Sequence, residues 1–304
     1  MPLSRILLVA ITLLSAASTC IAQTPANEEP APPREPGENA PPSLITDRVS
    51  REQRAHGENP SLILPYRPNY IMPVTYIDDP GEVPAAGDGG ELDNVETKFQ
   101  ISFRLPLWDD VFSDNGDVLF AYTQLSLWQI FNDELSSPFR ETNYEPELIA
   151  SFDTDWDILG LKNRLLMVGL VHQSNGRSEP LSRSWNRVYA NFIMEKDSFA
   201  LSVKPWYRFP ESEDDDDNPD IEDFLGHGEV RGVYKYAANV FSAKLRNNLD
   251  FGQNRGALEL SWSFPLRKGL IGYTELFTGY GETLIDYNRD ITRVGIGVAM
   301  NTWF

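Results

Sequence analysis

Short segments of alternating apolarity, repeated along most of the chain, constrain the fold more than any other feature. From residue 68 onward, segments of about ten residues recur, many with an apolar side chain at every second position and turn residues between them. A period of two is the spacing of side chains on one face of a β-strand. The pattern predicts twelve strands, over residues 68–77, 95–106, 117–131, 146–156, 161–173, 185–195, 198–209, 222–236, 239–250, 255–264, 269–280 and 291–303.

The last of these segments shows the pattern most clearly. Val294 and Ile296 alternate with Arg293 and with glycines, so one face suits lipid and the other a crowded interior. The chain ends on an aromatic residue, Phe304, and other aromatic residues recur at strand ends, as in the girdles of membrane barrels. The sequence therefore predicts an all-β fold, a twelve-stranded antiparallel transmembrane β-barrel over residues 61–304. A soluble two-layer sandwich is the alternative.

The N-terminal region has a different composition. Residues 1–22 read as a secretory signal, with Arg5 before an apolar core and a small-residue cleavage site at its end. Residues 23–60 are rich in Pro and Glu, which predicts a flexible tail. The one cysteine, Cys20, lies in the signal, so the mature chain would have no thiol chemistry. Lipidation of Cys20 is the alternative to cleavage. A barrel with a secretory signal is expected in the outer membrane of a Gram-negative cell.

The chain is strongly acidic, with a formal net charge of −19 at pH 7. Such a charge disfavours nucleic acid as a partner and suits divalent cations. The sharpest acidic run is Glu211–Asp217, most of which is expected to be a solvated loop. No segment after the signal offers about 20 uninterrupted apolar residues, so no membrane-spanning helix is expected.

The candidate site lies in the predicted strand 161–173 and just beyond it. His172 and Ser174 have the parity of Leu170, so they continue an outward-facing row. Serine becomes a nucleophile when a base removes its proton, and histidine is the usual base. Asn186 starts the next strand, and an antiparallel hairpin would bring it beside His172, where its carbonyl could orient the ring. Taken alone, a His-x-Ser pair is weak evidence, since most such pairs are accidental.

The surrounding motifs are much more specific. They are residues 172–178 (HQSNGRS), 182–187 (SRSWNR) with Tyr189, 136–146 (SSPFRETNYEP), 203–207 (VKPWY), 218–220 (NPD) and 279–288 (GYGETLIDYN). Together they resemble the active-site region of outer membrane phospholipase A, and the resemblance runs from about residue 55 to the end. The resemblance implies a barrel with a Ser-His-Asn triad on its outer surface, which hydrolyses acyl esters of phospholipids and lysophospholipids.

Carried over motif by motif, the resemblance assigns catalytic roles. It implies that Ser174 is the nucleophile, His172 the base and Asn186 the residue that orients the base. The backbone N–H of Gly176 would help to hold the oxyanion, together with a calcium-bound water.

The resemblance also implies a Ca²⁺ cofactor and an active homodimer. Ser182 Oγ and the carbonyl of Arg177 would bind the ion from one subunit, with Ser136 of the partner subunit completing the set. A second calcium site would use Glu179 and Asp217. Glu179 departs from the aspartate expected there, and the acidic run before Asn218 is longer than expected.

Gln124 stands where the family has a membrane-embedded glutamine at the dimer interface. Two such residues can hydrogen-bond across a two-fold axis. Ile101 and Phe103 on the neighbouring predicted strand would supply apolar contact. The alternative is a glutamine that faces the interior.

Two rival functions remain at this point. One is a barrel without enzymatic activity, such as a narrow pore or a structural protein. The other is a barrel hydrolase that acts on a peptide or on a lipid A ester.

Overall fold

The computed structural model describes residues 43–59, 62–81, 91–112, 115–267 and 269–303. The chain divides into two compact units, residues 1–41 and 42–304. The predicted signal, residues 1–22, and the tail up to residue 42 lie outside the described residues.

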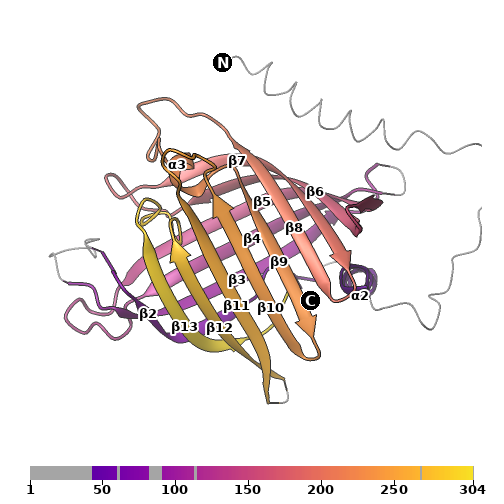
Figure 1. The fold of residues 1–304 in the computed structure, drawn as a ribbon, viewed down its shortest axis with the longest axis horizontal. Coiled ribbons are helices and arrows are strands. Elements are labelled where there is room, and N and C mark those ends of the chain that lie inside the picture. The colour runs from indigo at the N-terminus through magenta and orange to yellow at the C-terminus, as the bar shows by residue number, and fades with distance from the viewer. Residues whose placement is uncertain (1–42, 60–61, 82–90, 113–114, 268, 304) are drawn as a thin grey trace, which may run out of the picture. The chain divides into compact units, whose positions relative to one another are not determined.

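Strands β2 to β13 form one closed antiparallel sheet, which confirms the predicted twelve-stranded barrel (Figure 1). Consecutive strands are neighbours throughout, and β13 pairs with β2 to close the sheet. The bounds are β1 (Leu64–Pro65), β2 (Tyr70–Ile77), β3 (Val95–Trp108), β4 (Asp117–Trp128), β5 (Phe139–Ile158), β6 (Leu161–Ser174), β7 (Ser184–Lys196), β8 (Phe199–Arg208), β9 (Gly228–Tyr236), β10 (Asn239–Asn247), β11 (Gly256–Arg267), β12 (Leu270–Gly279) and β13 (Ile291–Ala299).

Two strands begin several residues away from the starts that the sequence predicted. Strand β5 begins at Phe139, because Glu141 and Asn143 point into a polar interior and so hide the apolar alternation. Residues 222–227, predicted as strand, instead hold the short helix α3 (Glu222–Leu225). Leu225 joins the apolar core, and Gly226 ends the helix with a φ of 68°, which favours glycine. The two-residue strand β1 pairs with β3 and adds to the predicted set.

Part of the predicted flexible tail is a helix, α2 (Leu44–Glu58), which corrects the prediction for these residues. The Ser43 side chain accepts a hydrogen bond from Thr46 N and caps the helix. Arg48 Nη1 donates to the carbonyl of Trp303 at 2.7 Å, and Ile45 N donates to Glu195 at 3.0 Å. The partners that order this helix lie far away in the sequence, so its local composition could not reveal them.

The connections between strands alternate between long and short, which distinguishes the two ends of the barrel. Residues 159–160, 197–198 and 237–238 make two-residue turns, whereas 129–138, 175–183, 209–227 and 280–290 make long loops. Both α2 and the end of β13 lie at the short-turn end. Outer-membrane barrels carry short turns on the periplasmic side and longer loops outside.

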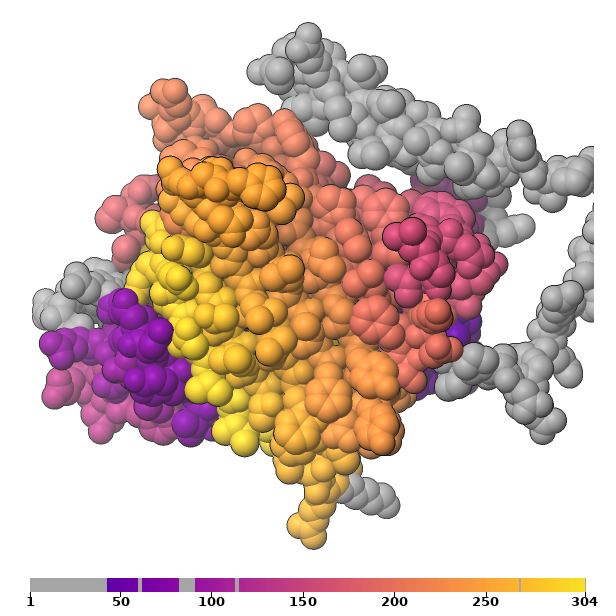
Figure 2. All heavy atoms as spheres, in the orientation of Figure 1, coloured from indigo at the N-terminus to yellow at the C-terminus, as the bar shows by residue number. Residues whose placement is uncertain are grey.

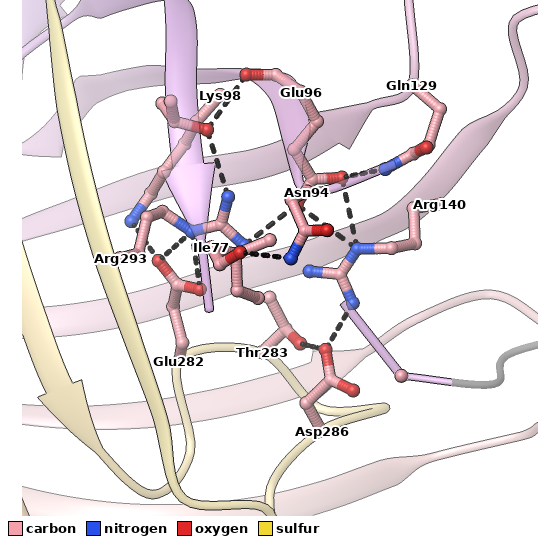
Figure 3. A network of polar contacts seen from close by, with 12 residues as sticks. Ile77, Asn94, Glu96, Lys98, Gln129, Arg140, Glu282, Thr283, Asp286 and Arg293 are labelled. Carbon is pink, nitrogen blue, oxygen red and sulfur yellow. Dashed lines mark hydrogen bonds and ion pairs between the residues drawn. The ribbon is translucent and has the colours of Figure 1, made fainter. Parts of the chain in front are cut away.

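A network of ion pairs lies in the interior of the barrel (Figure 3). The guanidinium of Arg140 is fully buried between the carboxylates of Glu96 and Asp286. Arg293 bridges Glu96 and Glu282, with distances of 2.7 and 2.8 Å. Each of these charges has a partner of opposite sign, as burial requires. The network ties β3, β5 and β13 to the loop that follows β12.

The outer surface is apolar, as expected for contact with lipid. On β13, the side chains of Val294 and Ile296 are 52% and 58% exposed, whereas Arg293 is 1% exposed. Figure 2 shows the face formed by the orange and yellow strands. The exposed apolar side chains of strands β10 to β12 include Phe241, Leu245, Trp262 and Leu276. Within the described part of the chain, no helix is long and apolar enough to cross a membrane.

Candidate active site

The candidate triad lies on the outer surface of the barrel, at the long-loop end of β6. Leu170 and His172 are exposed, whereas Val171 between them is buried. Ser174 has the same parity and is the last residue of the strand. The structure therefore places His172 and Ser174 on one face, as their parity predicts.

Strand β7 brings Asn186 beside His172. The two residues face each other in the β6–β7 register, and His172 Nδ1 lies 2.9 Å from Asn186 Oδ1. An amide oxygen can only accept a hydrogen bond, so this contact places the imidazole proton on Nδ1. Nε2 then keeps a lone pair and can accept a proton, as a general base must.

A residue that the sequence analysis missed contacts Asn186 from the other side. Asn186 Nδ2 donates to Glu211 Oε1 at 2.8 Å. Glu211 opens the acidic run that was expected to be a solvated loop. In the sequence, only the position of Glu211, three residues after the end of β8, indicates that it could reach Asn186, and that indication is weak.

The loop after β6, residues 175–183, is organised by a buried asparagine. Asn175 Nδ2 donates to the carbonyl of Leu181 at 2.9 Å, and its Oδ1 accepts from Arg183 N at 3.0 Å. Gly176 follows with a φ of 65°, and a Cβ at this position would lie 3.1 Å from the ring of Tyr144. Both the conformation and the close ring favour glycine at the position that was assigned to oxyanion binding.

Arg177 anchors the same loop to β5. Its Nε lies 3.2 Å from Glu141 Oε2, and its guanidinium also donates to the carbonyl of Arg140. The side chain of Arg140 also belongs to the interior network. Strand β5 is therefore in contact with both the loop 175–183 and the interior network.

Three side chains assigned to metal binding lie together where loops 175–183 and 209–221 meet. Ser182 Oγ donates to Asp217 Oδ2 at 2.5 Å. A hydrogen bond to the Asp217 carboxyl raises the pKa of the neighbouring Glu179. Hydroxyl, carbonyl and carboxylate oxygens are the donors that calcium prefers. No group of three or more His, Cys, Asp or Glu side chains with metal-binding geometry occurs among the described residues.

Ser136 lies on a different loop, residues 129–138. It is exposed and has a φ of 60°, a conformation uncommon for a non-glycine residue. The loop is fixed nearby, since Trp128 Nε1 donates to the carbonyl of Ser137 at 2.9 Å. In the described part of the chain, no hydrogen bond joins Ser136 to Ser182 or Asp217.

Gln124 faces outward, so the alternative of an interior glutamine is excluded. On β4, Ala121 and Thr123 are buried and share one parity, which faces the interior. Gln124 has the opposite parity, so its side chain points outward. Its Nε2 donates to Ser126 Oγ at 3.1 Å. In the β3–β4 register, Ile101 pairs with Gln124 and Phe103 with Tyr122, so the three predicted interface residues form one outer patch.

Comparisons with known proteins agree on one family. The family model described as phospholipase A1 matches residues 45–300. The phospholipase A1 of Escherichia coli is 42% identical over 248 residues, which are 81% of this chain and 84% of that protein. The phospholipase A1 of Klebsiella pneumoniae is 41% identical over 248 residues, 81% of this chain and 85% of that protein.

Solved structures give the same result. Outer membrane phospholipase A from Escherichia coli superimposes with a TM-score of 0.75 at 41% identity, covering 80% of this chain and 99% of that one. The Salmonella typhi outer membrane phospholipase, solved as a dimer with bound calcium, gives a TM-score of 0.75 at 39% identity, covering 81% of this chain and 95% of that one. The Escherichia coli protein has also been solved as an active-site mutant in which an asparagine is replaced by alanine.

Proposed function

Because the chain belongs to the phospholipase A1 family and is a phospholipase of the Gram-negative outer membrane, we propose that it uses a Ser174-His172-Asn186 triad. The proposed substrates are the acyl esters of phospholipids and lysophospholipids. The observation that carries the proposal is the 2.9 Å contact between His172 Nδ1 and Asn186 Oδ1, beside a serine on the same face. An outward-facing site suits a substrate that arrives from the membrane.

The reaction follows from these positions. Ser174 Oγ attacks the ester carbonyl while His172 Nε2 takes its proton. Asn186 Oδ1 accepts from Nδ1–H and so stabilises the imidazolium that forms. The Gly176 N–H donates to the oxyanion. His172 then returns the proton to the leaving alcohol, and a water activated by the same base releases the fatty acid from the acyl-serine.

The residues present suit a calcium ion, since Ser182 Oγ and the carboxylates of Glu179 and Asp217 lie together and offer oxygen ligands. We assign Ser182 Oγ and the carbonyl of Arg177 to the ion from one subunit, and Ser136 of the partner subunit from the other. When bound there, calcium would stabilise the negative charge that develops on the substrate oxygen. Glu179 and Asp217 would form the second site, and the repulsion between their carboxylates favours a cation.

We assign the active state to a homodimer in which Gln124, Ile101 and Phe103 meet their counterparts. A relative solved as a calcium-bound dimer supports this assignment. The exposed position of Ser136 supports it too, because that hydroxyl is open to a neighbouring subunit.

The decisive test is fatty-acid release from mixed phospholipid–detergent micelles by the wild type and by Ser174→Ala, each with calcium and with chelator. We expect activity that requires both Ser174 and calcium. Full activity in Ser174→Ala would overturn the triad. A folded, calcium-loaded wild type that is inactive on phospholipid and active on a lipid A ester or a peptide would support the rival hydrolase instead.

A further inference from the structure

The triad has a neighbour that extends it by one residue. Strand β8 ends at Arg208, and the chain then turns back toward β7, where Phe209 N donates to the carbonyl of Asn186 at 2.8 Å. Two residues further on, Glu211 Oε1 accepts from Asn186 Nδ2 at 2.8 Å. The start of the loop after β8 is thus fixed to Asn186 by both its backbone and a side chain, and Glu211 is itself half-buried.

We propose that Glu211 is a positioning residue that sets the orientation of the Asn186 amide and, through it, the tautomer of His172. The inference rests on the proposed triad. An asparagine amide can present either its oxygen or its nitrogen to a neighbour, and the two orientations have nearly the same shape. A carboxylate only accepts hydrogen bonds, so Glu211 requires the nitrogen and leaves the oxygen for His172.

The orientation matters because only one tautomer of His172 can act as the base. With Asn186 Oδ1 facing the ring, the proton lies on Nδ1 and Nε2 is free to accept the proton of Ser174. With the amide reversed, Asn186 Nδ2 would donate to Nδ1, and the ring proton would move to Nε2. That tautomer cannot deprotonate the serine.

Glu211 also supplies a charge that the triad lacks. Asparagine is neutral, so by itself it stabilises an imidazolium less than an aspartate would. The Glu211 carboxylate lies one hydrogen bond further out and polarises the amide toward His172. Hydrogen bonds link His172, Asn186 and Glu211, which belong to β6, β7 and the loop that follows β8, and Ser174 lies on the same face of β6 as His172.

The test is the tautomer of His172, read from its ¹⁵N chemical shifts in the calcium-free protein at a pH where the imidazole is neutral. The chain has only three histidines, so the His172→Ala variant assigns the signals. We expect the Nδ1–H form in the wild type and a shift toward Nε2–H in Glu211→Gln, because a glutamine side chain can also donate. Glu213→Gln removes the same charge from the same loop at an exposed position and should leave the tautomer unchanged.

Kinetics give a second readout. Glu211→Gln should lower kcat on the order of tenfold and leave KM within about twofold, whereas Glu211→Asp should keep most of the activity. Asn186→Asp should be poorly active because it sets a carboxylate against Glu211, and Asn186→Asp combined with Glu211→Gln should recover activity.

An Nδ1–H tautomer that persists in Glu211→Gln, together with an unchanged kcat, would overturn the role of Glu211. If wild-type activity still required Ser174, the triad itself would stand. Loss of the Ser174 requirement would instead remove the triad, whatever the tautomer.

Discussion

At the scale of single residues, the site combines exposure with fixed geometry. The side chain of His172 is exposed on the surface of the barrel, so burial does not orient its ring. A hydrogen bond from the next strand does this instead, since Asn186 is its register partner and contacts Nδ1. The precision of the proposed base therefore comes from strand pairing, which is rigid.

The role of Asn186 can be measured by removing its amide. In Asn186→Ala the proposed base keeps its place on β6 and loses its orienting partner, so kcat should fall on the order of ten- to a hundredfold and not vanish. Fatty-acid release at saturating substrate measures this change, with the thermal transition as a check on folding. Complete loss of activity in a folded protein would show that Asn186 does more than orient His172.

Gly176 should be the least replaceable residue of the loop. In Gly176→Ala the new methyl group would meet the ring of Tyr144, in a conformation that costs a non-glycine residue about 1–2 kcal/mol. The proposed oxyanion donor would be displaced, and kcat should fall at least tenfold, since losing one such donor costs roughly a hundredfold or more. Gly160→Ala is the control, because it also has a positive φ but lies in a turn at the opposite end of the barrel. Equal activity of the two variants would separate Gly176 from catalysis.

At the scale of elements, two loops bring together residues of the two proposed calcium sites. Ser182 belongs to the loop between β6 and β7, and Asp217 to the loop between β8 and β9. Their 2.5 Å hydrogen bond joins the two loops. Metal binding at this place would therefore depend on how the two loops pack.

Ser182→Ala tests that dependence. The variant loses one oxygen donor, so the calcium concentration for half-maximal activity should rise, on the order of tenfold for one lost ligand group. Activity at saturating calcium should largely recover. Ser178→Ala in the same loop serves as the matched control. A calcium titration curve that is identical to the wild type would remove Ser182 from the proposed ligands.

The sequence predicted the elements whose faces differ in polarity and missed those defined by distant partners. Alternation located most of the twelve strands, and the parity of His172 and Ser174 gave their outward direction. The start of β5 was missed because its inward residues are charged, and α2 because Arg48 and Ile45 find their partners on the barrel. Glu211 was missed for the same reason, since a hydrogen bond between a loop residue and a strand residue 25 positions away leaves no local pattern.

At the scale of the whole molecule, the barrel acts as a rigid support whose inside and outside are connected. Arg140 holds Glu96 and Asp286 in the interior, and its carbonyl accepts a hydrogen bond from Arg177 in the loop 175–183. The proposed oxyanion donor, Gly176, therefore lies on a loop tied to the strand that carries part of this buried ion-pair network. Such support suits a site that must keep its geometry next to fluid lipid.

The register also relates the expected dimer interface to the proposed nucleophile, Ser174. Gln124 on β4 pairs with Tyr144 on β5, and Tyr144 pairs with Ser174 on β6. With neighbouring strands about 4.8 Å apart, Gln124 and Ser174 are separated by roughly 10 Å across the surface. A second barrel seated over β3 and β4 would border the proposed site and could offer it a side chain.

The variant Gln124→Ala tests whether this patch forms the dimer interface. Gln124→Ala removes an outward-facing amide, so the proposed calcium-dependent dimer should weaken by about 0.6–1.7 kcal/mol, roughly three- to twentyfold in its dissociation constant. Sedimentation equilibrium in detergent with calcium measures the constant. Thr278→Val, which removes a hydroxyl from the outer face of β12, should leave it unchanged. If both variants dimerise like the wild type, the subunits meet on another face of the barrel, and Ser136 of the partner subunit would lose its place in the proposed site.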